Sequence, residues 1–185
     1  MVLMSSFKLL IQENTQMPRI YHHIFMVPEQ AIDENGHVNN VEYVRWMEQA
    51  AKLHSQVEGC TQETSLLGAT WVVRTHRIEY FKPILTGEQI AVLTWVSNWR
   101  RARSLRKYKF LRLAEPSILA AAETDWIFVD SQTGRPRSIP ESVSGLFELL
   151  PPNEESGELE TFVRDYSVDT PHAVRRGDSW FNKSP

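Results

Sequence analysis

The sequence predicts an α+β fold, a single domain in which a long antiparallel β-sheet wraps around a central α-helix. Three observations support this prediction. One segment has the periodicity of a helix that is covered on most sides, four later segments have the β-branched and aromatic composition of strands, and the turn signals between those strands leave short connections. A chain of 185 residues suits one such domain and is long enough to bury a real core.

A first strand, expected around residues 19–27, precedes the central helix. Between Asn39 and Val57 the polar residues recur every three or four positions and form one hydrated stripe, which consists of Glu42, Arg45, Gln49, Lys52 and Gln56. Most of the remaining circumference is apolar, so we expect other structure to cover it. Asn39 or Asn40 is suited to cap the first turn, and Gly59 lies just beyond the last one.

The strand-like segments follow the helix in succession. Turn signals separate them: Pro83 with Gly87, a run of arginines, and Glu115 with Pro116. The connections are short enough for an antiparallel meander. The expected strands are residues 70–82, 88–99, 104–114 and 117–130.

The composition is that of a soluble globular protein and excludes several classes of site. A net charge of −3 shows no global bias toward nucleic acid or membrane, and we find neither an export signal nor a membrane span. A lone cysteine, Cys60, allows no intramolecular disulfide and no cysteine-based zinc cluster, so the cytoplasm is expected. No metal or cofactor is predicted, because the histidines lack ligand spacing: His22, His23, His54 and His76.

Composition also suggests where the domain ends. We expect an N-terminal extension over residues 1–18, the folded domain over 19–150 and a C-terminal extension over 151–185. The second border rests on the stretch PPNEESGELE, whose Pro, Gly and Glu content is typical of loops. Aromatic residues continue beyond it, so the extension has the means to pack on the domain: Phe162, Tyr166, Trp180 and Phe181.

An ordered run of hydrogen-bonding residues stands directly before the helix, in the stretch DENGHVNNVEYVRW. Each residue alone is explained by a turn or a helix cap, but the ordered run is not. Together with later motifs, it makes residues 19–140 resemble the 4-hydroxybenzoyl-CoA thioesterase and acyl-ACP thioesterase branch of the hot-dog superfamily. The motifs are Asp33-x-x-Gly36-His37-Val38-Asn39-Asn40-x-x-Tyr43-x-x-Trp46, Tyr80-x-x-Pro83, Gly87-Glu88, Thr124-Asp125-Trp126 and Gly134-Arg135-Pro136.

The resemblance implies hydrolysis of an acyl-CoA or acyl-carrier-protein thioester to an acid and a thiol. Asp33 is the expected general base or nucleophile, with both mechanisms open, and the amide near Asn40 is expected to stabilise the oxyanion. Asn35 and His37 are expected to orient Asp33, the water or the acyl group, although a structural role for His37 is equally open. Substrate contacts are expected from Gly36, Val38, Asn39 and Tyr43.

One departure from the resemblance concerns the nucleophile. Plant acyl-ACP thioesterases carry a further acid and a cysteine at positions that here look like Pro83 and Ile84. A cysteine nucleophile is therefore excluded. Glu79 is a candidate substitute for the acid, but an exposed strand residue is the favoured interpretation. This departure gives Asp33 more weight. The resemblance also implies a homodimer or a dimer of dimers, with substrate tunnels between subunits.

A basic patch, WRRARSLRKYKFLR, stands out in a chain that is otherwise slightly acidic. Arg100, Arg101 and Arg103 are expected to hold the phosphates of coenzyme A or an acidic acyl carrier protein. A solvated face balanced by the Glu-rich tail is the alternative of similar weight, and nucleic acid is favoured least. Two other functions remain open: a hot-dog hydratase or dehydratase, and a non-catalytic module that binds acyl thioesters.

Overall fold

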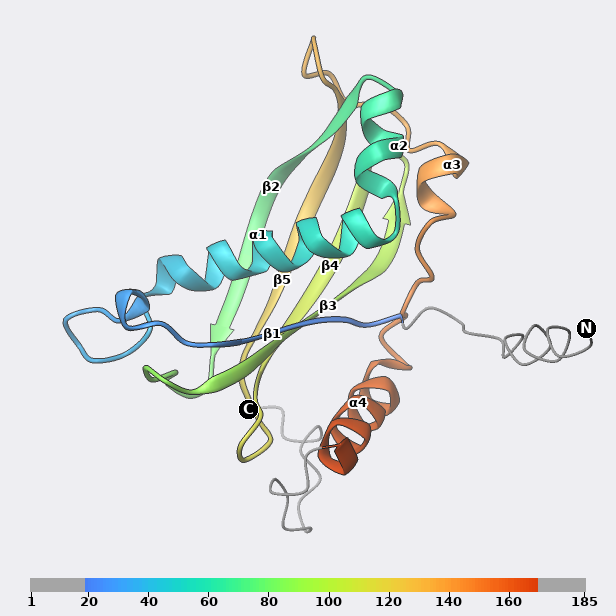
Figure 1. Cartoon of the computed structure of the whole chain (residues 1–185). Helices are drawn as coiled ribbons and strands as arrows, with labels where there is room; N and C mark the ends of the chain where they lie inside the picture. Colours follow the sequence, from blue (N-terminus) through green and yellow to red (C-terminus); the bar gives the residue numbers. More distant parts are fainter. Residues whose placement is uncertain (1–18, 170–185) are drawn as a thin grey trace, which may run out of the picture.

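The computed structural model describes residues 19–169 and confirms the predicted α+β class. Five antiparallel strands form one sheet in the order β1-β3-β4-β5-β2. The strands are β1 (Tyr21–Met26), β2 (Ala69–Tyr80), β3 (Gln89–Arg100), β4 (Arg103–Arg112) and β5 (Ser117–Asp130). Helix α1 (Asn40–Val57) crosses one face of this sheet (Figure 1). The predicted central helix and all five predicted strands are therefore confirmed.

The expected meander of four consecutive strands is wrong in one respect. Strands β3, β4 and β5 do form a meander, but β2 pairs with β5 at the edge of the sheet, and β1 lies beside β3. The connection over residues 81–88 therefore crosses three strand spacings, about 14 Å. Eight residues can span that distance easily. Adjacency in sequence was thus a poor guide to pairing, because α1 carries the chain across the sheet before β2 begins.

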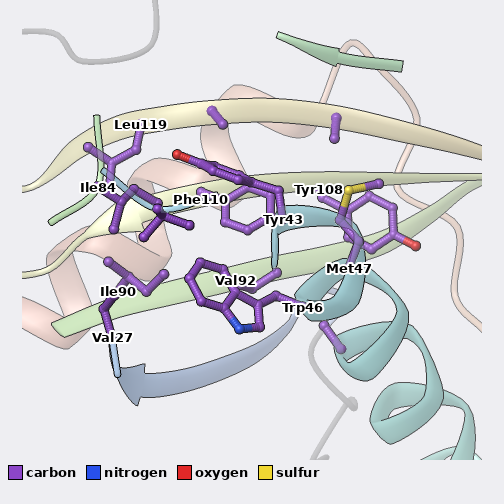
Figure 2. Close-up of a cluster of buried hydrophobic side chains, with 14 of the residues drawn as sticks. Val27, Tyr43, Trp46, Met47, Ile84, Ile90, Val92, Tyr108, Phe110 and Leu119 are labelled. Atoms are coloured by element: carbon purple, nitrogen blue, oxygen red, sulfur yellow. The ribbon is translucent and has the colours of Figure 1, made fainter. Parts of the chain in front are cut away.

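The core lies between α1 and the sheet. Figure 2 shows Tyr43, Trp46 and Met47 of α1 among side chains of the sheet, including Phe110 of β4. The Tyr43 and Phe110 rings lie 5.0 Å apart between centroids, and burial raises the pKa of Tyr43 to about 12. Alternate residues of β3 and β4 point at this core, as expected for strands covered on the α1 side.

Helix α1 is less enclosed than its pattern predicted. Asn39 is its N-cap, and four residues of the predicted stripe are exposed, with Glu42 half-buried. Val41 and Val57, expected to face protein, are 55% and 56% exposed. Both lie at the ends of the helix, where the sheet no longer reaches over the side chains.

Three short helices were not predicted: η1 (Glu29–Ala31), α2 (Cys60–Leu66) and α3 (Glu141–Ser144). Helix α2 follows α1 almost at once, because Gly59 takes a left-handed φ of 75° that turns the chain. Figure 1 shows α2 and α3 together at the end of the sheet away from β1. They close that end of the core against Val96 and Phe128.

The C-terminal extension contains a helix where its composition suggested a loop. Helix α4 (Glu155–Asp169) places apolar side chains at helical spacing against the sheet face opposite α1: Leu159, Phe162, Val163 and Tyr166. Arg19 anchors the helix through ion pairs with Glu154 at 2.5 Å and with Glu158. The aromatic residues Trp180 and Phe181 lie outside the described residues, as do the expected extension 1–18 and the last sixteen positions.

The core makes a stability prediction. Met47 is completely buried under the sheet, so Met47→Ala should cost about 2–5 kcal/mol through lost burial and a residual cavity. The melting temperature should fall by about 4–20 °C for a domain of this size. Gln49→Ala, on the exposed side of the same helix, is the matched control and should change stability by less than about 0.5 kcal/mol. Equal melting temperatures for the two variants would contradict this packing.

Candidate active site at the amino end of α1

The predicted motif forms a tight loop that leads into α1. The Asp33 N–H donates to the His37 carbonyl at 2.8 Å, and the Gly36 N–H donates to the Asp33 carbonyl at 3.0 Å. Gly36 has a φ of 77°, which glycine adopts without strain. The loop is therefore held as a defined turn rather than as an open segment.

Two further hydrogen bonds fix the loop to the core. The Val38 N–H donates to the Ile84 carbonyl at 2.9 Å, and the Asn39 N–H donates to the Ala31 carbonyl at 2.8 Å. Val38 and Ile84 are both buried. Ile84 stands where the resemblance places a cysteine, and its part here is to anchor the loop. Glu79 is exposed on β2 and pairs with Arg77 at 2.5 Å.

The Asp33 carboxylate is half-exposed at the base of this loop. Its Oδ1 accepts from the Asn35 N–H at 2.8 Å, and its Oδ2 accepts from the Asn35 Nδ2 at 3.4 Å. Asn35 thus orients Asp33, one of the roles expected from the sequence. The His37 side chain is exposed and has no hydrogen-bond partner within residues 19–169. The His37 side chain makes no hydrogen bond with the Asp33 carboxylate.

The start of α1 leaves one backbone donor available. Asn39 Oδ1 accepts from the Val41 N–H at 3.0 Å, and the Asn39 carbonyl accepts from the Glu42 N–H at 2.9 Å. No acceptor for the Asn40 N–H exists in the described part of the chain. An N–H with no partner at a helix amino end, next to the positive end of the helix dipole, is suited to an anionic oxygen.

Not all of the predicted site residues gather at this loop. Tyr43 points into the core, where its ring meets that of Tyr80 at a centroid distance of 4.9 Å. Arg100 and Arg101 are exposed at the turn between β3 and β4. Strand β3 starts near the Asp33 loop and is twelve residues long, so these arginines lie roughly 35–40 Å from its start. Within one chain they cannot share a small ligand with Asp33.

Most other cations of the basic patch are already paired. Arg103 makes a bidentate ion pair with Asp125, its Nε donating at 3.0 Å. Lys107 pairs with Glu155 of α4 at 2.6 Å, and Arg112 pairs with Glu88 at 2.9 Å. The Glu-rich extension thus balances part of the patch, as one sequence reading proposed. Arg100 and Arg101 form no ion pair within the described residues.

The structure adds two plain findings on metals and membranes. Within residues 19–169, no three side chains among His, Cys, Asp and Glu lie close enough together to hold a metal ion. No helix in that same part of the chain is long and apolar enough to cross a bilayer.

Solved structures share the fold. The acyl-ACP thioesterase from Bacteroides thetaiotaomicron matches with a TM-score of 0.65 and 20% identity over 72% of this chain and 56% of that one. The 1,4-dihydroxy-2-naphthoyl-CoA thioesterase Slr0204 from Synechocystis matches with a TM-score of 0.62 and 16% identity, over 69% of this chain and 94% of that one. The hypothetical protein SAV2348 from Staphylococcus aureus, solved with CoA, matches with a TM-score of 0.63 and 14% identity. This match covers 94% of this chain and 99% of that one.

These likenesses establish the hot-dog-like fold, a sheet packed on a central helix. The chain spans little more than half of the Bacteroides enzyme. No curated protein matches this sequence significantly. A sequence profile described as the thioesterase-like superfamily matches residues 27–147, which include the Asp33 loop, α1 and the sheet from β2 to β5. The chain therefore belongs to the thioesterase-like superfamily.

Proposed function

We propose that this chain is an acyl thioesterase that hydrolyses an acyl-CoA or acyl-carrier-protein thioester to the free acid and the thiol. The observation that carries the proposal is that one anchored loop holds an oriented carboxylate, Asp33, and leads into the Asn40 N–H, which has no partner among the described residues. Thioester hydrolysis needs both an activated nucleophile and a donor for the developing oxyanion. Family membership supports the same chemistry.

In this mechanism the substrate carbonyl oxygen accepts from the Asn40 N–H. Asp33 either takes a proton from an attacking water or attacks the carbonyl carbon directly. In the first route the C–S bond breaks, the thiolate leaves and is protonated, and the acid keeps the oxygen of the water. In the second route the thiolate leaves a mixed anhydride on Asp33, and a water then hydrolyses this anhydride to the free acid and the Asp33 carboxylate. The Asn35 bonds hold the carboxylate in one orientation during these steps.

The test is thiol release from a panel of acyl-CoA and acyl-carrier-protein thioesters, followed with a thiol reagent. The proposal predicts turnover of at least one chain class. A hydratase would instead change enoyl-CoA or 3-hydroxyacyl-CoA while the thioester stays intact. A binding module would retain the thioester without releasing thiol. Either of these results, with no thiol released across the panel, would contradict the proposal.

We further propose that the enzyme works as a homodimer joined along β2. Within residues 19–169 this strand pairs only with β5, and its other edge is unpaired. Apolar side chains are exposed on and beside it, with Val72 and Val73 each at 42% and Phe81 at 46%. A long unpaired edge of this kind invites pairing with a second copy.

The dimer yields a prediction. The protein should have the mass of a dimer at micromolar concentration, as measured by light scattering, or of a tetramer built from such dimers. Val73→Lys should shift it toward monomer, because a charge within a shared edge opposes strand pairing. Glu115→Lys, on the turn between β4 and β5, is the control and should leave the mass unchanged. A wild-type monomer with full activity would refute the dimer.

Arg100 and Arg101 give a prediction about the substrate's handle. If they bind CoA phosphates or an acidic carrier, replacing both with Gln should raise KM several-fold with little loss of kcat. Added salt should have the same effect on the wild type. Arg103→Gln is a poor addition to this pair, because it also breaks the ion pair with Asp125. An unchanged KM for both classes of substrate would show that these arginines do not bind the substrate and only face the solvent.

A further inference from the structure

A pocket lies far from Asp33, between the last turns of α1, helix α2 and the sheet. Its volume is about 550 Å³, within the range of small-molecule sites. Its walls combine four aromatic side chains with serine and threonine hydroxyls, and the aromatic residues are Trp71, Trp99, Trp126 and Phe147. Along α1, Ser55 of this pocket lies fifteen positions after Asn40, about 22 Å from the proposed oxyanion donor. An apolar ligand body fits such walls.

One wall of this aromatic pocket carries a buried cation. Arg106 on β4 is 5% exposed and lines the pocket. Its Nη1 donates to His54 Nδ1 at 2.9 Å and to Thr94 Oγ1 at 3.3 Å, and its guanidinium lies 5.5 Å from the centre of the Phe147 ring. All three partners are neutral groups. In residues 19–169 no carboxylate oxygen lies within 4.0 Å of Arg106.

His54 does not supply the missing charge. Burial, together with the nearby Arg106 cation, lowers the pKa of His54 to about 3, so the ring is neutral at ordinary pH. Its Nδ1 accepts from Arg106, which places the ring proton on Nε2, 3.6 Å from Glu58 Oε1. Glu58 thus reaches Arg106 only through the imidazole. A guanidinium remains charged at neutral pH, and burying it without a direct counter-ion is costly.

The same pocket holds two buried donors that are not used. Trp99 Nε1 and Trp126 Nε1 both line it and have no hydrogen-bond partner within residues 19–169. Buried donors are nearly always paired, so two unpaired donors in one pocket point to an acceptor that arrives from outside. At the rim, Lys52 and Glu48 pair with each other at 2.7 Å, so neither competes for the interior.

We propose that this pocket binds a carboxylate carried on an apolar chain, with Arg106 as its counter-ion. Two sources have this chemistry. One is the far end of an ω-carboxyacyl thioester, which rests on the proposed function and would define its substrate class. The other is a free fatty acid, which needs no catalysis by this chain.

Direct binding tests the shared chemistry without relying on hydrolysis. Decanoate and 1-decanol are titrated into the full chain, with calorimetry and intrinsic tryptophan fluorescence as readouts, since three tryptophans line the pocket. Decanoate should bind at least tenfold more tightly. Arg106→Met, which keeps an unbranched apolar stem and removes the guanidinium charge, should abolish this preference, and Arg106→Lys should retain part of it. Equal affinity of the wild type for acid and alcohol would overturn the proposal, and this comparison needs no variant.

A second comparison separates the two sources. Thioether analogues of acyl-CoA cannot be hydrolysed, so a decyl chain and its ω-carboxyl counterpart report binding alone. Tighter binding of the ω-carboxyl analogue, lost in Arg106→Met, would assign the pocket to the substrate's far end. Preference for decanoate without preference between the analogues would assign it to a free fatty acid. These binding measurements do not require thioesterase activity. The proposed function and the proposed carboxylate pocket can therefore be refuted independently of each other. A preference for decanoate that survives intact in folded Arg106→Met would overturn the role of Arg106.

Discussion

Replacing Asp33 with Asn should lower kcat/KM for thioester hydrolysis by about 10²–10⁴-fold, the usual contribution of a positioned general base. Asparagine keeps the size of the side chain and an oxygen that can still accept from the Asn35 N–H. The loop, its anchor at Ile84 and the fold should therefore survive. What is lost is the basicity and nucleophilicity of the carboxylate, and both candidate mechanisms require one of these.

The measurement is steady-state thiol release by the two proteins, with melting curves to confirm that both are folded. Glu34→Gln is the matched control, because Glu34 is the exposed neighbouring acid and has no assigned role. It should hydrolyse the substrate at the wild-type rate. Hydrolysis by folded Asp33→Asn at the parent rate would remove Asp33 from the mechanism.

Replacing Asn40 with Pro should lower kcat by about 10²–10³-fold, the typical cost of one lost oxyanion donor. Asn40 is the first residue of α1, a position where proline suits the helix and where the N–H has no helical partner. The preceding Asn39 has an extended backbone, with φ −60° and ψ 136°, which is compatible with a following proline. The substitution therefore removes the donor while the helix start stays favourable.

The control for this variant is Asn40→Ala, which changes the side chain and leaves the backbone N–H in place. It should retain most of the activity, because the exposed Asn40 side chain is not the N-cap. The contrast between the two variants separates the backbone donor from the side chain. If proline and alanine reduced kcat equally, the oxyanion would not be bound at this amide.

The sequence predicted the central helix well because its polar residues recur with helical periodicity, and it predicted the strands because their β-branched and aromatic composition is bounded by turn signals. Pairing was harder: nothing near β2 indicates that the chain returns to the far edge of the sheet, since that depends on where α1 leaves it. Helix α4 was missed because its first turn is rich in residues typical of loops, although Leu159, Phe162 and Tyr166 follow at helical spacing. That spacing was the available signal.

At the candidate site, the order of residues in the motif indicated the loop and the cap, but not the direction of each side chain. The basic patch illustrates the limit most clearly. Along β4, alternate residues face opposite sides of the sheet, so Arg106 points inward with Tyr108 while Lys107 points toward α4. A run of cations concealed this alternation, and the pocket around Arg106 was not predicted. Strand alternation, applied to the run, would have singled out Arg106.

The central claim is that this chain hydrolyses acyl thioesters, and product analysis of one reaction tests it most directly. The wild-type protein is incubated with an acyl-CoA in ¹⁸O-enriched water, and the thiol and the acid are both quantified by mass spectrometry. We predict one free CoA for each free acid, with the heavy oxygen in the acid carboxyl group. Asp33→Asn should slow this release by about 10²–10⁴-fold. CoA thioesters that are bound but recovered intact, or modified in the acyl chain with the thioester preserved, would contradict the account.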